Sequence, residues 1–280
     1  MTDPPSGLST DDLMRLALDM AGMTITPGDS AVYVPGANLR RVMMGVDIGA
    51  PELLLARQLG VDGVVAHHPA GGAAELGFPR VLTRGIELMV EAGVPADAAR
   101  DVIQPLVARS LLRAQASNHD HAPSVARLLG MPFLNVHLPL DEVGRRIMVE
   151  TIAAQTAARG RDPLVEDVVA ALRTIPEIRD AQTRVMVPVG RLDRPAGRVA
   201  VYHGAGTNGG VPVARALFAS GAGTVVYIHL NPDDADRIKA LENHGSVVVA
   251  GHIAADLIGI NRYVAVLEGR GVEVVRMSGL

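Results

Sequence analysis

Cysteine is absent from the 280-residue chain, and this absence removes several kinds of chemistry at once. Without thiols there are no disulfides, no thiolate nucleophiles and no zinc sites built on cysteine. A metal ion would therefore be held by imidazole and carboxylate ligands. The sequence offers both, since it contains nine histidines and 30 aspartate and glutamate residues.

Aromatic residues are scarce at 2% and tryptophan is missing, although 48% of the residues are hydrophobic. The core must therefore be filled by aliphatic residues, which is typical of buried strands covered by helices. No apolar run approaches the ~20 residues that a membrane span requires. The N-terminus, MTDPPSGLSTDD, lacks the basic and apolar regions of a signal peptide. We therefore expect no membrane partner and a cytoplasmic location.

A concentration of positive charge is also missing. The net charge is −4, and lysine and arginine are scattered along the chain. A nucleic-acid-binding protein normally has a basic face, so nucleic acid is not an expected partner. No nucleophile motif such as G-x-S-x-G is present either.

Apolar runs that suit buried strands alternate with helical segments along the chain. Ser9, with Asp12 three residues later, predicts a first helix from about residue 10. Strands are expected at 39–47 and 61–66, and later ones in TRVMVPVG, RVAVYHG, TVVYIHL, SVVVAG and VEVVRM. This order predicts an α/β fold of two interlinked lobes, with mostly parallel sheets flanked by helices.

We expect residues 1–125, completed by 250–280, to form the first lobe and residues 126–249 the second. In parallel sheets, ligands bind where strands end and helices begin. Three polar clusters occupy such positions in the sequence, and each has a functional and a purely structural interpretation.

The first cluster is His67-His68-Pro69, directly after an apolar strand. Proline keeps His68 out of helical geometry, so the two rings project in different directions and could serve two neighbouring metal ions. The alternative is a pair of surface histidines in a loop.

The other two clusters combine histidine with aspartate. Asp120 lies among imidazoles in SNHDH, where its two oxygens could bridge two cations, or where it could simply cap a helix. His252 and Asp256 are four residues apart, which places both on one helical face as a pair of metal ligands. The alternative for this pair is a chance pairing in a capped helix.

Together the motifs AHHP, ASNHD and GHIAAD resemble the hexameric dinuclear-metal family labelled GTP cyclohydrolase I type 2 homologues. The resemblance extends over most of the chain. It implies a homohexamer and two divalent ions in a cleft between the lobes. The implied ligands are His67, His68, Asp120, His252 and Asp256. Imidazole and carboxylate ligands suit zinc, manganese, iron or nickel, and the sequence does not distinguish among these metals.

The sequence departs from the family pattern around the second and third motifs. Ala116 replaces a histidine, His119 replaces a leucine, and Asp256 is one methylene shorter than the family's glutamate. A helical insertion at about residues 96–115 also separates the first two motifs. These departures bear on whether both ions bind. The imidazoles of His119 and His121 are the candidate catalytic groups, because either could transfer a proton beside the metal.

A glycine-rich segment, Gly204 to Gly209, has the G-x-G-x-x-G pattern of a phosphate-binding turn. No acid ends the next strand as dinucleotide binding requires, so a structural turn is the favoured interpretation. Packing or surface roles are favoured for His137, His203 and His244, and His203 and His229 are weaker candidates for the cleft.

Three functions remain open on this evidence. The first is a metal-dependent hydrolase acting on an unknown small molecule, such as a nucleotide, a cyclic amide or a phosphoester. The second is a non-catalytic metal-binding scaffold or interaction protein, and the third is a nucleotide-binding protein that uses the glycine turn.

Overall fold

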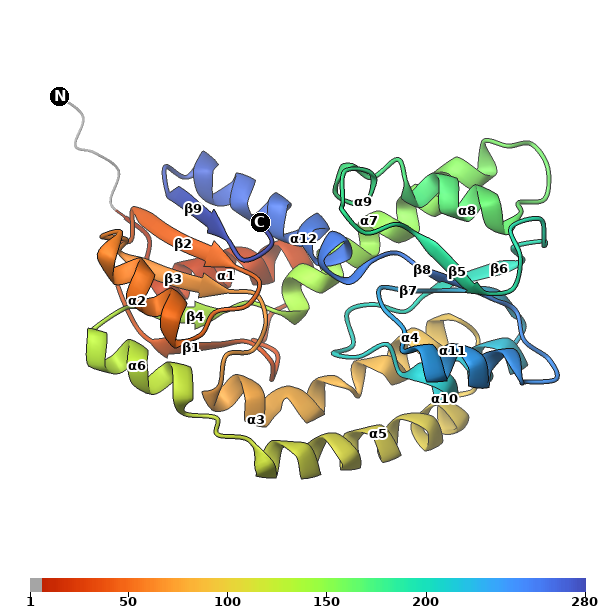
Figure 1. Ribbon diagram of the computed structural model, residues 1–280, viewed down its shortest axis with the longest axis horizontal. Helices are drawn as coiled ribbons and strands as arrows, with labels where there is room; N and C mark the ends of the chain where they lie inside the picture. Colours follow the sequence, from red (N-terminus) through yellow and green to blue (C-terminus); the bar gives the residue numbers. More distant parts are fainter. Residues whose placement is uncertain (1–6) are drawn as a thin grey trace. The chain divides into compact units, whose positions relative to one another are not determined.

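The computed structural model describes residues 7–280, and the chain divides into two compact units (Figure 1). Unit 1 comprises Met1–Val81, Ser110–Leu140 and Gly259–Leu280, and unit 2 comprises Leu82–Arg109 and Asp141–Ile258. Neither unit is one continuous stretch of chain. The domain bounds given from the sequence stay a prediction.

Unit 1 is built on a five-stranded sheet in the order β1-β4-β3-β2-β9. Its inner strands are apolar and buried on both faces, as parallel strands covered by helices must be. Only β1, at the edge, is antiparallel to its neighbour. The strands are β1 (Ala31–Val34), β2 (Arg41–Gly45), β3 (Gly63–Ala66), β4 (Phe133–Asn135) and β9 (Glu273–Met277).

The helices of unit 1 begin and end at residues that favour those positions. α1 starts after Ser9, whose hydroxyl accepts a hydrogen bond from the Asp12 amide, and it ends at Gly22 in the left-handed conformation. The capped start predicted from the sequence is thus confirmed. Unit 1 contains the helices α1 (Thr10–Ala21), α2 (Ala50–Gln58), α3 (Gly72–Val81) and α6 (His121–Leu129).

Unit 2 contains a four-stranded sheet in the order β5-β8-β7-β6, in which only β5 is antiparallel. Successive residues of the central strand face different cores: Val225 packs with one cluster and Val226 with the other. Helices cover both faces (Figure 1). The strands are β5 (Met186–Val189), β6 (Arg198–Val201), β7 (Ala222–Tyr227) and β8 (Ser246–Val249).

The remaining helices lie in unit 2 or pass from one unit to the other. Those in unit 2 are α4 (Arg84–Glu91), α8 (Val165–Leu172), α9 (Pro176–Arg179), α10 (Gly210–Ala219) and α11 (Pro232–Lys239). Those shared by both units are α5 (Ala96–Ala116), α7 (Leu138–Ala157) and α12 (His252–Gly269). The predicted α/β class, with parallel-rich sheets flanked by helices, is confirmed.

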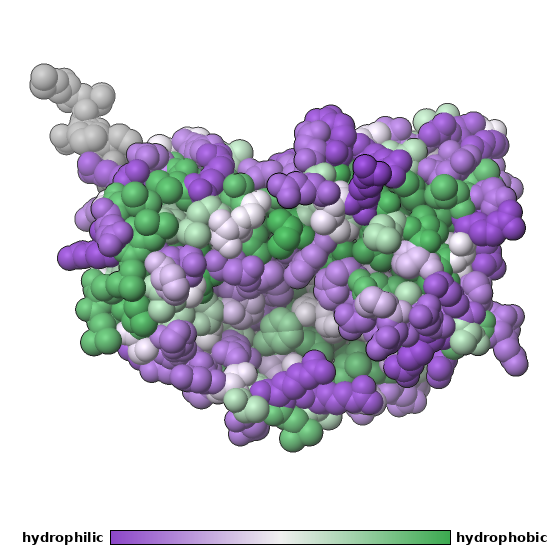
Figure 2. All heavy atoms as spheres, in the orientation of Figure 1, coloured by the Kyte–Doolittle hydropathy of each residue, from purple (hydrophilic) through white to green (hydrophobic). Residues whose placement is uncertain are grey.

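The surface of unit 1 exposes apolar side chains over α2, where Figure 2 shows green side chains gathered. Leu54 and Leu55 on this helix are about half exposed, and Leu128 on α6 is 88% exposed. Among the described residues, no helix combines the length and apolarity needed to cross a membrane.

Candidate metal centre

Three neighbouring strands of unit 1 end in polar residues at the same edge of the sheet. Asp47 follows β2, His67 and His68 follow β3, and His137 follows β4. These strands are mutually parallel, so their carboxyl ends lie together, where ligands bind in sheets of this kind.

The three histidines converge. His67, His68 and His137 each offer one ligand atom, and these atoms lie within 4.8 Å of one another. Their ring centroids are 5.0 to 5.6 Å apart. His67 has no exposed surface, His137 is buried and His68 is half-buried.

The hydrogen bonds of the rings determine which nitrogen carries the proton. Nδ1 of His67 lies 2.9 Å from the carbonyl oxygen of Val136. Nδ1 of His68 lies 2.7 Å from a carboxylate oxygen of Asp47, and Nδ1 of His137 lies 2.7 Å from one of Asp29. Carbonyl and carboxylate oxygens only accept hydrogen bonds, so each Nδ1 carries the proton. In each neutral ring Nε2 therefore keeps a lone pair for a metal.

A buried asparagine fixes the position of these groups. Asn135 donates from Nδ2 to the carbonyl oxygens of Asp29, at 2.7 Å, and His67, at 3.3 Å. Its Oδ1 accepts hydrogen bonds from the Tyr33 hydroxyl and the Ala31 amide. Burial raises the pKa of Tyr33, so this hydroxyl stays protonated and continues to donate. The site residues therefore rest on a rigid support, and the imidazole donor set fits a divalent metal.

Unit 2 repeats this arrangement with a second set of polar residues. His203 follows β6, His229 follows β7 and His252 follows β8. Nε2 of His252 lies 3.4 Å from Oδ2 of Asp256, which is 2% exposed. The rings of His229 and His252 are 4.8 Å apart between centroids. The i, i+4 pair predicted from the sequence is thus in contact at the start of α12.

A second buried pair accompanies this set in unit 2. Nε2 of His203 lies 3.9 Å from Oδ1 of Asp141, and both side chains are almost fully buried. Buried imidazole and carboxylate groups of this kind are costly unless they pair with each other or with a cation.

Asp120 occupies a different environment in unit 1. It stands directly before α6, and the guanidinium group of Arg127 donates to both of its carboxylate oxygens at 2.7 Å. It is exposed and belongs to none of the groups of the described residues that could hold a metal. His119 and His121 are exposed beside it and are likewise outside these groups. A bridging role for Asp120 and proton transfer by the two histidines stay predictions.

In the glycine-rich turn of unit 2, side chains of the turn accept hydrogen bonds from its own backbone amides. The Gly210 amide donates to Oδ1 of Asn208 at 2.9 Å, and the Gly209 amide donates to the Thr207 hydroxyl at 3.3 Å. The carboxylate of Asp234 also lies next to Gly210, where it would repel an anion. Gly209 and Gly210 have positive φ angles, which explains the glycines. The geometry therefore favours the structural interpretation over a phosphate cradle.

Sequence reasoning missed His137, Asp29 and Asp47. His137 and Asp47 each stand two residues after an apolar strand, just as His67 stands one residue after β3. The tendency of ligands to bind at the carboxyl ends of parallel strands is the sequence signal that marks both residues. Asp29 carries no such signal, because it lies outside any strand and 108 residues from its partner His137.

The fold and these residues define a class: an α/β protein with buried histidine and aspartate groups that are compatible with metal binding. The chain is 65% identical to a NIF3 superfamily protein from Sphaerobacter thermophilus, whose crystal structure matches with a TM-score of 0.96 over 98% of this chain and 100% of that chain. The chain therefore belongs to the NIF3 superfamily.

Two more distant structures share the fold alone. Reduced HcgD from Methanocaldococcus jannaschii is 11% identical with a TM-score of 0.56, over 96% of this chain and 98% of that one. A Bacillus cereus protein related to NIF3 is also 11% identical, with a TM-score of 0.51 over 99% and 97% of the two chains. No family model and no curated protein matches the chain. None of these three relatives is described as a cyclohydrolase.

Proposed function

We propose that this protein binds two divalent metal ions and acts as a metal-dependent hydrolase of a small molecule. One observation carries the proposal: the three histidines of unit 1 have Nδ1 beside oxygen acceptors, and each offers a ring nitrogen within 4.8 Å of the others. Imidazoles oriented by carboxylate and carbonyl oxygens are the usual ligands of catalytic metals.

The residues have distinct parts in this proposal. His67, His68 and His137 hold one ion, and His252 with Asp256 supplies a second set of ligands in unit 2. Bound divalent metal supplies Lewis-acid polarisation of a substrate oxygen and activation of water. Asp29 and Asp47 keep the protons of His137 and His68 on Nδ1, and Asn135 fixes the chain beneath them. The substrate class is a phosphoester, a nucleotide or a cyclic amide.

Elemental analysis by mass spectrometry tests the metal centre. We expect nearly two transition-metal equivalents per chain in native protein and loss of metal in the double variant His67→Ala/His68→Ala. His244→Ala is the matched control, because this partly buried histidine contacts the neighbouring Gly245 carbonyl oxygen and belongs to none of the possible metal-holding groups of the described residues. A variant of the second set, His252→Ala/Asp256→Ala, shows how many ions depend on unit 2.

Hydrolysis is then screened with the metal found. We expect activity on a phosphoester, nucleotide or cyclic amide that disappears both with chelator and in the His67/His68 variant. A chain that binds no metal after reconstitution with zinc or manganese contradicts the whole proposal. Metal binding without hydrolysis of any of these classes contradicts the enzyme and leaves the non-catalytic scaffold.

Self-association is part of the same proposal. The exposed leucines of α2 and α6 form an apolar surface of the kind that marks protein–protein contacts. We propose that this surface takes part in the homohexamer implied by the resemblance.

A further inference from the structure

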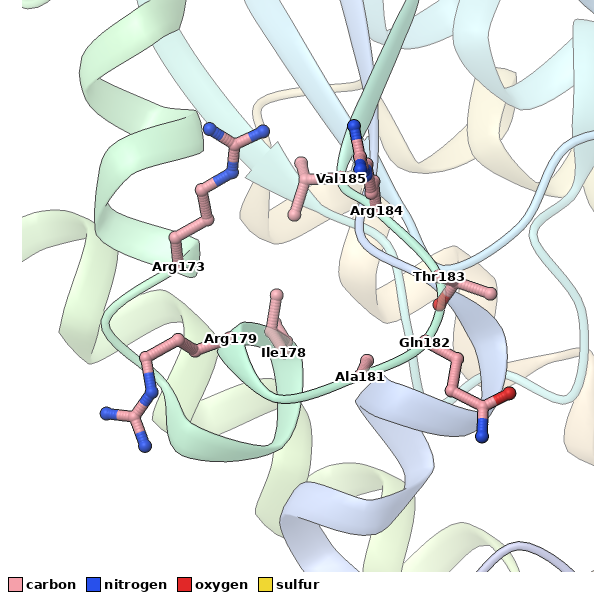
Figure 3. A pocket seen from close by; sticks show the side chains of 8 residues that line it. All are labelled: Arg173, Ile178, Arg179, Ala181, Gln182, Thr183, Arg184 and Val185. Carbon is pink, nitrogen blue, oxygen red and sulfur yellow. The ribbon is translucent and has the colours of Figure 1, made fainter.

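An arginine-lined pocket in unit 2 is separate from the histidine and aspartate sets. It has a volume of about 450 Å³ and is formed by the end of α8, by α9 and by the segment that leads into β5. Figure 3 shows the side chains of Arg173 and Arg184 extending from opposite walls toward the same opening, with Val185 between them. The side chain of Arg179 points away from this opening.

Arg173 and Arg184 form no ion pair with a carboxylate among the residues that the structure describes. Other arginines of the same region are paired with aspartates: Arg179 binds Asp180, Arg191 binds Asp193 and Arg161 binds Asp167. No acidic residue lines the pocket. Two guanidinium groups therefore face one opening without a carboxylate, although acids are available nearby in the sequence.

The floor of the pocket is apolar. Ile178 and Val185 are buried, and they line it together with Ala181. A polar rim is provided by Thr183, whose hydroxyl lies close to the backbone of Gly251, the residue before His252. The pocket thus combines two fork-shaped cationic donors with an apolar wall, and it adjoins the start of α12.

The neighbouring hollow limits where an anion can bind. This hollow, of about 550 Å³, shares Arg173 and Val185 with the pocket, but Glu166 and Asp193 also line it. These carboxylates would repel a second anionic group. The cationic end of the site is therefore the pocket between Arg173 and Arg184.

We propose that this pocket binds the phosphate group of a small phosphate monoester, with the organic part of the ligand against Ile178 and Val185. A guanidinium group matches phosphate oxygens through two parallel N–H···O bonds, and two such groups can contact one tetrahedral dianion from both sides. The chain as a whole is acidic, so the attraction arises from this local arrangement and not from net charge.

Calorimetric titration of phenyl phosphate into chelator-treated protein tests the site without metal. Wild-type protein is expected to bind, and Arg173→Gln/Arg184→Gln is expected to bind at least about tenfold more weakly. The control Arg57→Gln/Arg215→Gln removes the same charge from two exposed positions outside the pocket and should retain wild-type affinity. Arg173→Lys/Arg184→Lys keeps the positive charge but cannot form the paired hydrogen bonds of a guanidinium group. We therefore expect an affinity between those of wild type and Arg173→Gln/Arg184→Gln.

Several results would overturn the proposal. These are no binding by metal-free wild type, equal weakening in the control variant, or binding that requires metal and disappears in His67→Ala/His68→Ala. The two target arginines are exposed, so thermal melts of the variants should match wild type and exclude unfolding as the cause. Success or failure here is independent of hydrolysis, because the experiment measures binding alone.

Discussion

At the scale of single residues, the buried pair of Asp29 and His137 has the greatest consequence for chemistry. Asp29 has no exposed surface, and its carboxylate is held 2.7 Å from Nδ1 of the imidazole. Asp47 makes an equivalent contact with His68 but is 71% exposed. A carboxylate removed from water interacts more strongly with its partner than one that is solvated and screened. The two aspartates therefore differ in how firmly they orient a ligand.

Asp29→Asn should weaken metal binding more than Asp47→Asn. An amide in place of the buried carboxylate no longer enforces the Nδ1–H tautomer of His137, and loss of such partners costs about 10- to 100-fold in metal affinity. Competition with a chelating dye during zinc reconstitution measures this change.

The exposed Asp19→Asn serves as a control and should leave zinc affinity unchanged. If Asp29→Asn bound zinc as tightly as Asp19→Asn, then His137 would not be a ligand and the assignment of the unit 1 set would fail.

Site residues could be predicted from the sequence only where a short local motif marks them. His67 with His68, and His252 with Asp256, stand in short motifs, and the structure brings each pair together. The sequence predicts a packing or surface role for His137 because no carboxylate is near it in sequence, yet Asp29 reaches it across 108 residues. Such pairings depend on the tertiary fold, so sequence spacing could not reveal them.

At the scale of elements, α8 illustrates how one buried carboxylate stabilises a helix start. Asp167 accepts a hydrogen bond from the Leu164 amide at 2.8 Å and lies 2.9 Å from the guanidinium of Arg161. The amide hydrogen bond, with Arg161 and Arg159 nearby, lowers the pKa of Asp167. The ionised form is therefore favoured in the folded chain.

Asp167→Asn should reduce the free energy of unfolding by about 1–2 kcal/mol at pH 7, the range for a lost helix cap. Because folding lowers this pKa, the stabilisation is fully present above the unfolded pKa of about 3.9 and is lost as the pH falls through the folded pKa. Urea unfolding from pH 7 down to pH 2 should therefore show the difference between variant and wild type shrinking in acid.

The exposed Asp162→Asn is the control for this measurement, and its stability should follow wild type at every pH. A constant difference between Asp167→Asn and wild type across the acid range would show that charge is not the cause.

The positions of the helices and strands were largely predictable from the sequence, but the pairing of strands within the sheets was not. The insertion at about 96–115 is helical, as α5, and VEVVRM is a strand, as β9. The strand expected at 39–47 is shorter, Arg41–Gly45, and the chain bends at Val46 and Asp47. Nothing local indicates that β9 pairs with β2, because that pairing depends on the whole fold.

At the scale of the molecule, bound metal should stabilise the protein because it binds only the folded chain. At a free metal concentration of 100 times Kd, each bound ion contributes about 2.7 kcal/mol, which corresponds to roughly 5 to 10 °C in Tm. Chelator should therefore lower Tm by at least this amount in native protein and by less in His67→Ala/His68→Ala, which retains only the ligand set of unit 2. Differential scanning calorimetry measures the shift.

Light scattering on the same samples separates the hydrolase from the scaffold. We expect the oligomer to persist without metal, because the proposed contact surface on α2 and α6 contains leucines and none of the proposed ligands. Dissociation of the assembly on chelation would favour the metal as a structural element of a scaffold.

The strand order of the unit 1 sheet also affects how the protein folds while it is being synthesised. Arg41 of β2 contacts Glu273 of β9 across 232 residues, so the edge of β2 has no partner until that last strand leaves the ribosome. At about 5–20 residues per second, this wait lasts roughly 10 to 50 s. Throughout that time an apolar strand edge is open to other nascent chains, and a chaperone that shields it would act on unit 1.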